Sequence, residues 1–170
     1  MNKHWLLKPN LRDKISTYHE NEFTGTFVIG IQLRLYYLTK SDLRTFFSCA
    51  LEIERQRADV IRNRTVRWFV STDKSDVLDE IEREFGDKII MGYGKLGHVN
   101  KQPDAYERAL FDVEMLARCD ELILTGGSTF GLVASFMSQK RPFYVEGKRH
   151  GCGVLSLAMP PIQFDGHSSI

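Results

Sequence analysis

One stretch of the sequence, residues 104–142, limits the choice of folds more than any other. It carries apolar residues at helical spacing, then the short apolar run 121–125, and then the turn Gly-Gly-Ser-Thr-Phe-Gly at 126–131. A second apolar helical segment and a proline close the stretch. We predict a helix, a buried parallel strand, a turn and a second helix, with Asp104 as the first helix's N-cap and Glu107 completing a capping box.

The turn at residues 126–131 has two interpretations. Backbone N–H groups point outward at a helix N-terminus, and the helix dipole favours negative charge, so a strand that enters a helix through glycines and hydroxyls can bind an anion. The same residues also suit an ordinary helix N-cap with flexible glycines. Because the turn matches neither a Walker loop nor a GxGxxG fingerprint, phosphate binding and capping remain equally open.

Strands and helices alternate along the rest of the chain. Further apolar strands are expected at residues 27–34, 66–70, 88–91 and 141–145, and further helices begin at Ser41 and Ser75. This order predicts an α/β, Rossmann-like fold with a mostly parallel sheet and helices on both faces. We expect three parts: a linker, inter-domain segment or short helix at 1–24, the Rossmann-like domain at 25–150, and a segment at 151–170 that is irregular, like the chain from Glu146 onward.

Composition excludes several functional classes. The 23 Lys and Arg residues nearly balance the 22 Asp and Glu residues, and the net charge of +1 gives no attraction to nucleic acid or anionic membranes. The three cysteines form no CxxC pair and the histidines show no metal-site spacing, so we expect neither a disulfide framework nor a bound metal. We find no signal-peptide core and no membrane-spanning run, and the length also suits one half of a longer protein.

Polar residues follow the expected strands at their carboxyl ends, where ligands of open parallel sheets bind. Gln32 and Arg34 end the first strand, and Ser71 to Asp73 follow the second. The planar guanidinium group of Arg34 matches a phosphate with two hydrogen bonds, although a surface ion pair is the usual role of an arginine. Residues 71–73 suit ligand contact or helix capping. His98, in the glycine-rich loop 92–103, is a further candidate for ligand contact, although most loop histidines are simply solvated.

Several motifs resemble those of the fucosyltransferases. Ile29-Gly-Ile-Gln-Leu-Arg34, Cys49-Ala-Leu-Glu52 and Gly126-Gly-Ser-Thr-Phe-Gly131 are similar to motifs of the xyloglucan-type enzymes, which place fucose on the 2-hydroxyl of galactose. Arg67-Trp-Phe-Val-Ser-Thr-Asp73 resembles the second donor-domain strand of the core and protein-O-fucosyltransferases. The likeness extends from Phe27 to Pro160. It implies a GT-B architecture in which this chain is the C-terminal half that binds the nucleotide sugar.

The resemblance also implies roles for individual residues. Arg34 would clamp the diphosphate of the donor and stabilise the leaving GDP, as the catalytic residue of this half. Gln32 takes the place that other fucosyltransferases give to a histidine beside the base, and Asp112 would accept hydrogen bonds from the guanine edge. Three residues of the turn would lie at the diphosphate and guanine: Ser128, Thr129 and Phe130. With Asp73 and His98 they complete the expected donor site.

The remaining implications concern partners and location. The donor would be GDP-fucose, and the acceptor a glycan with terminal galactose, without a metal ion and without nucleic acid. The family implies Golgi glycan biosynthesis, cell-wall synthesis or protein glycosylation. The general base is expected in a missing N-terminal half, together with any membrane anchor.

The sequence also departs from the family pattern. Leu35 stands where many relatives have a second arginine, and Pro161-Ile162 replaces a family cysteine after Pro160, so Cys152 has no disulfide partner there. Two alternatives to a transferase therefore stay open: a nucleotide-binding module that kept the fold and lost the chemistry, and an unrelated Rossmann-like reductase. The absence of GxGxxG after the first strand counts against the reductase.

Overall fold

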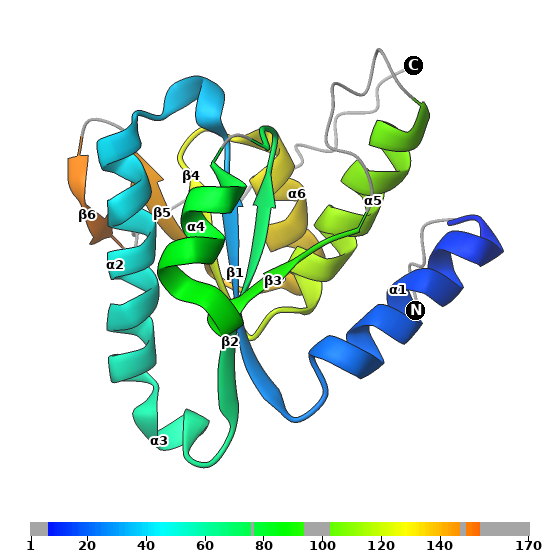
Figure 1. Cartoon of the computed structure of the whole chain (residues 1–170), viewed down its shortest axis with the longest axis horizontal. Helices are drawn as coiled ribbons and strands as arrows, with labels where there is room; N and C mark the ends of the chain where they lie inside the picture. Colours follow the sequence, from blue (N-terminus) through cyan, green and yellow to red (C-terminus); the bar gives the residue numbers. More distant parts are fainter. Residues whose placement is uncertain (1–6, 76, 94–102, 147–148, 154–170) are drawn as a thin grey trace, which may run out of the picture.

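Six strands form one sheet in the part of the chain that the structure describes (Figure 1). This computed structural model describes residues 7–75, 77–93, 103–146 and 149–153. The strands are β1 (Thr26–Leu33), β2 (Thr65–Thr72), β3 (Ile89–Met91), β4 (Glu121–Thr125), β5 (Phe143–Glu146) and β6 (Arg149–Gly153). Their order across the sheet is β3-β2-β1-β4-β5-β6, in which β1 to β5 are parallel and β6 is antiparallel to β5. The predicted mostly parallel α/β sheet is confirmed.

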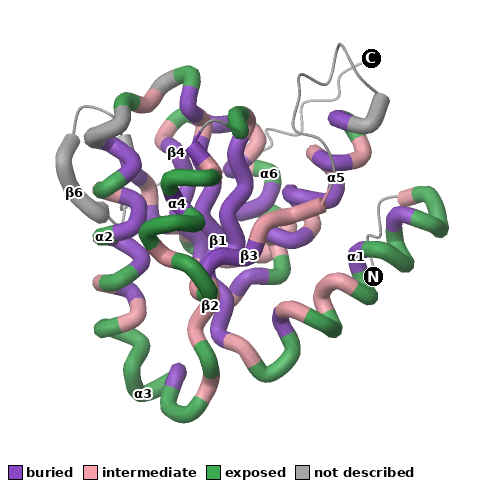
Figure 2. The backbone as a smooth tube through the Cα atoms, viewed as in Figure 1, coloured by how far each residue is buried: buried purple, intermediate pink, exposed green. Residues whose placement is uncertain are grey.

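Helices cover both faces of this sheet (Figure 1). The helices are α1 (Pro9–Glu22), α2 (Lys40–Gln56), α3 (Ala58–Ile61), α4 (Leu78–Phe85), α5 (Pro103–Arg118) and α6 (Thr129–Ser138), with the short 3-10 turns η1 (Leu35–Tyr37) and η2 (Gly86–Lys88). Successive strand side chains point to opposite faces. Ile29 and Ile31 of β1 therefore pack in the core beside α2 and α4, whereas Val28 packs in the core beside α1, α5 and α6. Strands β1, β2 and β4 occupy the buried centre (Figure 2).

The N-terminal helix α1 packs against the domain rather than extending away from it. Leu11 and Ile15 are buried in the same core as α5. Tyr18 donates a hydrogen bond to the carbonyl of Met91 at 2.5 Å, and its ring meets Phe111 of α5 edge-on with the ring centroids 5.1 Å apart. For residues 1–24 the sequence allowed a linker, an inter-domain segment or a short helix. The structure shows a helix over residues 9–22.

Two local predictions were wrong. Helix α5 begins at Pro103, so Asp104 lies within its first turn and is not its N-cap; proline is favoured at this position because its φ is already helical. Glu107 is then the fifth residue of the helix and not its third, so it does not stand at the capping-box position. Its carboxylate accepts hydrogen bonds from Lys14 Nζ at 2.7 Å and from the Tyr93 hydroxyl at 3.1 Å. The prediction of irregular structure from Glu146 onward was wrong for residues 149–153, which form β6 and pair with β5.

The cysteines differ from one another in state. Cys49 of α2 is buried and disulfide-bonded, whereas Cys119 is a free thiol in the core. Burial raises the pKa of the Cys119 thiol, so this group stays protonated. An odd number of cysteines excludes complete pairing but permits a single bridge, and our expectation from the count was wrong in this respect.

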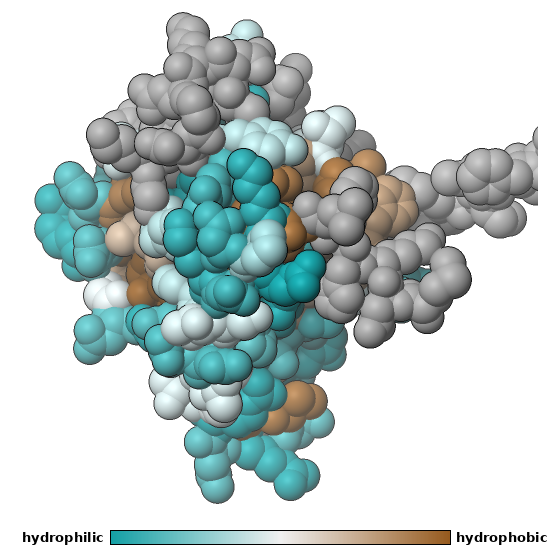
Figure 3. Space-filling model, turned by 90° about the vertical axis from the view of Figure 1, so that its right-hand side faces the viewer, coloured by the Kyte–Doolittle hydropathy of each residue, from teal (hydrophilic) through white to brown (hydrophobic). Residues whose placement is uncertain are grey.

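The described residues expose few large apolar side chains. The view in Figure 3 shows a mainly hydrophilic face with separate apolar patches. Exposed large apolar residues in the described part of the chain are Tyr36, Leu51, Val60, Tyr106, Val133 and Phe136. Among the described helices, none combines the length and the apolar character that crossing a membrane requires.

Candidate functional site

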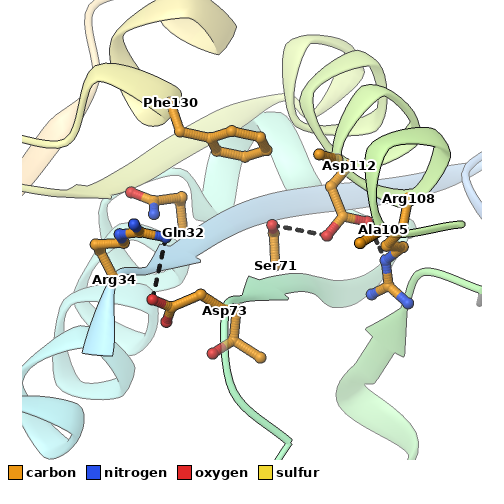
Figure 4. A pocket seen from close by; sticks show the side chains of 10 residues that line it. Gln32, Arg34, Ser71, Asp73, Ala105, Arg108, Asp112 and Phe130 are labelled. Atoms are coloured by element: carbon orange, nitrogen blue, oxygen red, sulfur yellow. Dashed lines mark hydrogen bonds and ion pairs between the residues drawn. The ribbon is translucent and has the colours of Figure 1, made fainter. Parts of the chain in front are cut away.

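A pocket lies at the carboxyl ends of β1 and β2, between the first turn of α6 and one face of α5 (Figure 4). The cavity encloses about 540 Å³ of empty space, part of which is open to solvent. The lining residues are Gln32, Arg34, Ser71, Thr72, Asp73, Ala105, Arg108, Ala109, Asp112 and Phe130. The pocket is therefore at the edge of the sheet where the sequence predicted ligand binding.

Arg34 and Asp73 form an ion pair on one side of the pocket. Arg34 Nη1 lies 3.1 Å from Asp73 Oδ2, and Asp73 Oδ1 accepts the backbone N–H of Leu35 at 3.0 Å. The Arg34 side chain is 39% exposed, so its guanidinium group stays within reach of a ligand. The two roles that the sequence left open for Arg34 are compatible, because the residue makes an ion pair and also lines the pocket.

Gln32 joins the end of β1 to the end of β4. Its side-chain Oε1 accepts the backbone N–H of Thr125 at 3.3 Å, while Thr125 Oγ1 donates to the Gln32 carbonyl at 2.8 Å and accepts the Arg34 backbone N–H at 2.9 Å. The start of α6 packs closely on this side chain, because a Cβ added to Gly131 would lie 3.0 Å from Gln32 Oε1. Gln32 therefore fixes the backbone that carries Arg34.

The three predicted residues of the turn have different surroundings. Ser128 is buried and caps α6, since its Oγ accepts the backbone N–H of Gly131 at 3.4 Å. Thr129 is exposed, and neither residue is among those that line the pocket. The ring of Phe130 does line the pocket and extends over it from α6 (Figure 4). Capping by Ser128 is thus observed, and a role for Ser128 and Thr129 at a ligand stays a prediction.

Asp112 is a buried carboxylate on the opposite side of the pocket from Arg34 (Figure 4). Its Oδ1 accepts a hydrogen bond from Arg108 Nε at 2.7 Å, and its Oδ2 accepts one from the Ser71 hydroxyl at 2.9 Å. Both contacts favour the ionised form, but burial outweighs them and raises the pKa of Asp112 to about 6. The carboxylate is therefore charged at neutral pH, and mild acid protonates it.

We expect Asp112 to make the protein less stable as the pH rises from about 4 to about 6. Its pKa is about 6 in the folded state against a usual value of 3.8, so within this window the folded state binds more protons than the unfolded state. The free energy of unfolding then falls with rising pH, by on the order of 1–3 kcal/mol. Urea denaturation at a series of pH values measures this change. Asp112→Asn should lack this contribution, and equal pH dependence in both proteins would contradict the prediction.

The structure brings five of the eight predicted donor-site residues together in the pocket: Gln32, Arg34, Asp73, Asp112 and Phe130. His98 lies outside the described residues, and its assignment stays a prediction. Among the described residues, no group of three or more His, Cys, Asp or Glu side chains is arranged to hold a metal ion.

The sequence reasoning missed Arg108, the second guanidinium group of the pocket. The signal was present in the spacing of Ala105, Arg108, Ala109 and Asp112, which places all four residues on one face of a helix. The two alanines leave space between this helix face and the sheet. The i,i+4 ion pair of Arg108 and Asp112 lies on the same face, so the pattern indicates a hollow lined by charges. An i,i+4 pair is usually a surface feature, so the helix alone did not identify it.

No protein-family model and no curated protein matches the sequence. Solved structures do match the fold. The chain is similar to NodZ alpha-1,6-fucosyltransferase soaked with GDP-fucose, at 23% identity over 82% of this chain, with a TM-score of 0.57. A second structure, of fucosyltransferase NodZ from Bradyrhizobium, matches at 24% identity over 82% of this chain, also with a TM-score of 0.57.

Two further matches are more distant in sequence. A mutant of Arabidopsis thaliana FUT1 in complex with GDP matches 80% of this chain at 14% identity, with a TM-score of 0.54. POFUT1 in complex with GDP matches 83% of this chain at 13% identity, with a TM-score of 0.52. The chain covers 44% of NodZ, 32% of FUT1 and 47% of POFUT1. It therefore has the fold of about a third to a half of each of these enzymes, and at such identities the likeness concerns the fold alone.

Proposed function

We propose that this chain binds GDP-fucose and is the donor-binding half of a GT-B fucosyltransferase. The observation that carries the proposal is the pocket, in which the guanidinium group of Arg34 and the buried carboxylate of Asp112 lie on opposite sides of one cavity. These two groups suit a guanine nucleotide, because its phosphates attract a cation and its base offers adjacent N–H donors to a carboxylate. The fold likeness to proteins solved with GDP or GDP-fucose supports the same ligand here.

Each pocket residue has a chemical role in this proposal. Arg34 binds the diphosphate with its planar fork, stabilises the negative charge that develops on the departing GDP, and is held in place by Asp73. Asp112 accepts the N1–H and 2-amino donors of guanine, and the ring of Phe130 stacks on the base. Transfer by this route requires no metal ion when cationic and N–H groups stabilise the leaving diphosphate. Gln32, Ser128, Thr129 and His98 complete the proposed donor site.

Residues 25–150 are the donor domain in this proposal. Because the chain covers 44% of NodZ, we place the acceptor site and the general base in a further half of a longer protein. The motifs favour a xyloglucan-type enzyme with terminal galactose as acceptor, acting in the Golgi. Each of these finer assignments rests on the sequence resemblance.

A nucleotide-binding module without transferase activity is the second candidate. It is favoured by Leu35, which stands where many fucosyltransferases have a second arginine. A transfer assay with galactose-terminated acceptors, on the chain in its full-length context, separates the candidates. Fucose transfer supports the enzyme, and GDP-fucose binding without transfer supports the module.

We expect GDP and GDP-fucose to bind this chain and ADP and NADPH to bind at least tenfold more weakly. The physical reason is that adenine presents a ring-nitrogen acceptor where guanine presents its N1–H donor, so adenine leaves the Asp112 carboxylate incompletely paired. Isothermal titration calorimetry with the four ligands measures the difference. Equal affinities for all four ligands, or heat from none of them, would overturn the donor site, and preferential binding of NADPH would support a reductase.

A further inference from the structure

We infer that Arg108 is a positioning residue, which fixes the Asp112 carboxylate in the orientation that selects guanine. This inference rests on the proposed GDP-fucose site and adds to it a specificity-determining residue that is not itself expected to contact the base.

Arg108 connects Asp112 to the segment that follows β3. Its side chain is 6% exposed, its Nε donates to Asp112 Oδ1 at 2.7 Å, and its Nη1 donates to the backbone carbonyl of Tyr93 at 2.9 Å. Because a guanidinium group is planar and rigid, these two contacts fix its plane. The other carboxylate oxygen of Asp112 is fixed from β2 by the Ser71 hydroxyl at 2.9 Å. Donors from two different elements therefore hold the carboxylate.

The fixed carboxylate keeps acceptor capacity for a ligand. Each ionised carboxylate oxygen has two lone-pair sites, and the contacts to Arg108 and Ser71 engage one oxygen each. The group lines the pocket (Figure 4), so a base that enters can donate two parallel hydrogen bonds to it. Guanine has two such adjacent donors, N1–H and the 2-amino group. Hypoxanthine has only N1–H, and adenine has neither in this arrangement.

Gly92 lies close to the ion pair of Arg108 and Asp112. A Cβ built on Gly92 would lie 2.5 Å from Asp112 Oδ1 and 3.0 Å from the Cζ and Nε atoms of Arg108. A methyl group at this position therefore displaces the side chains of the pair while both charges stay in place. Gly92→Ala thus tests the orientation of Asp112 separately from its charge.

The test compares GDP with inosine diphosphate, which lacks the 2-amino group. In the wild-type chain we expect GDP to bind roughly tenfold more tightly than inosine diphosphate. This ratio corresponds to about one hydrogen bond to a charged group. In Arg108→Met and in Gly92→Ala the ratio should fall to less than about threefold. Arg108→Lys should restore part of the preference, because its ammonium group can donate to Asp112 Oδ1.

The matched control is Arg64→Met, because Arg64 also pairs with an aspartate, Asp120, at 3.2 Å, but outside the pocket. It should keep the wild-type ratio. Circular dichroism confirms folding, and if Arg108→Met does not fold, Gly92→Ala and Arg108→Lys carry the test. A wild-type chain that binds no GDP overturns the proposed function itself. GDP binding with no preference over inosine diphosphate, or with an unchanged preference in folded Arg108→Met and Gly92→Ala, overturns only the inference about Arg108.

Discussion

Replacing Arg34 by lysine is expected to lower the affinity for GDP at least tenfold, while the affinity for guanosine changes little. The substitution keeps the positive charge, so the loss measures the planar, two-pronged hydrogen bonding that lysine lacks. Hydrogen bonds to charged groups contribute about 1.5–3 kcal/mol each, and about 1.4 kcal/mol corresponds to a factor of ten. Guanosine has no phosphates, so its affinity should not change. Calorimetric titration of both ligands into both proteins measures the effect.

Arg57→Lys is the matched control for this experiment. The Arg57 side chain is 44% exposed and pairs with Glu121 through Nε at 2.6 Å, outside the residues that line the pocket. An exposed ion pair contributes roughly 0–1 kcal/mol, so neither ligand should bind differently. If Arg34→Lys weakens GDP and guanosine equally, or weakens neither while the protein stays folded, Arg34 is not the diphosphate clamp.

Truncating Phe46 to alanine should lower the free energy of unfolding by about 3–5 kcal/mol. The side chain is completely buried in the core between α2 and the sheet. Its removal loses the transfer free energy of the ring and leaves a cavity that closely packed neighbours cannot fill. Since a domain is stable by only about 5–15 kcal/mol in total, the loss should be evident in a urea denaturation curve at neutral pH.

Phe136→Ala makes the same chemical change on the surface. Phe136 of α6 is 61% exposed, so its truncation should alter the free energy of unfolding by about 0.5 kcal/mol or less. Losses of similar size in the two variants would mean that Phe46 is not packed as described here.

The sheet could be predicted from the sequence because its strands are short apolar runs bounded by polar or glycine residues. Residues 121–125 were expected as a strand and form β4, and the run 66–70 lies within β2. The strand β6 could not be predicted, since Arg-His-Gly-Cys-Gly shows no apolar alternation. Its conformation depends on pairing with β5, which is a tertiary contact.

The candidate site was only partly predictable for a similar reason. Arg34 follows a strand, and parallel strands end at a common edge, so its position could be inferred from the order of elements alone. Asp112 lies in the middle of a helix and was identified only through the resemblance to fucosyltransferases. Arg108 was missed because its importance comes from burial against Gly92 and Tyr93, and these residues follow a different strand. No local pattern contains that information.

The two ion pairs of the pocket also determine how a ligand would approach it. Arg34 with Asp73 and Arg108 with Asp112 make two cations and two anions, so the charges of these four residues cancel, and the whole chain carries only +1. A neutral site on a nearly neutral molecule has little long-range field, and it cannot accelerate the diffusional encounter with an anionic nucleotide. Association should therefore depend only weakly on ionic strength, and attraction begins when the ligand reaches the guanidinium group itself.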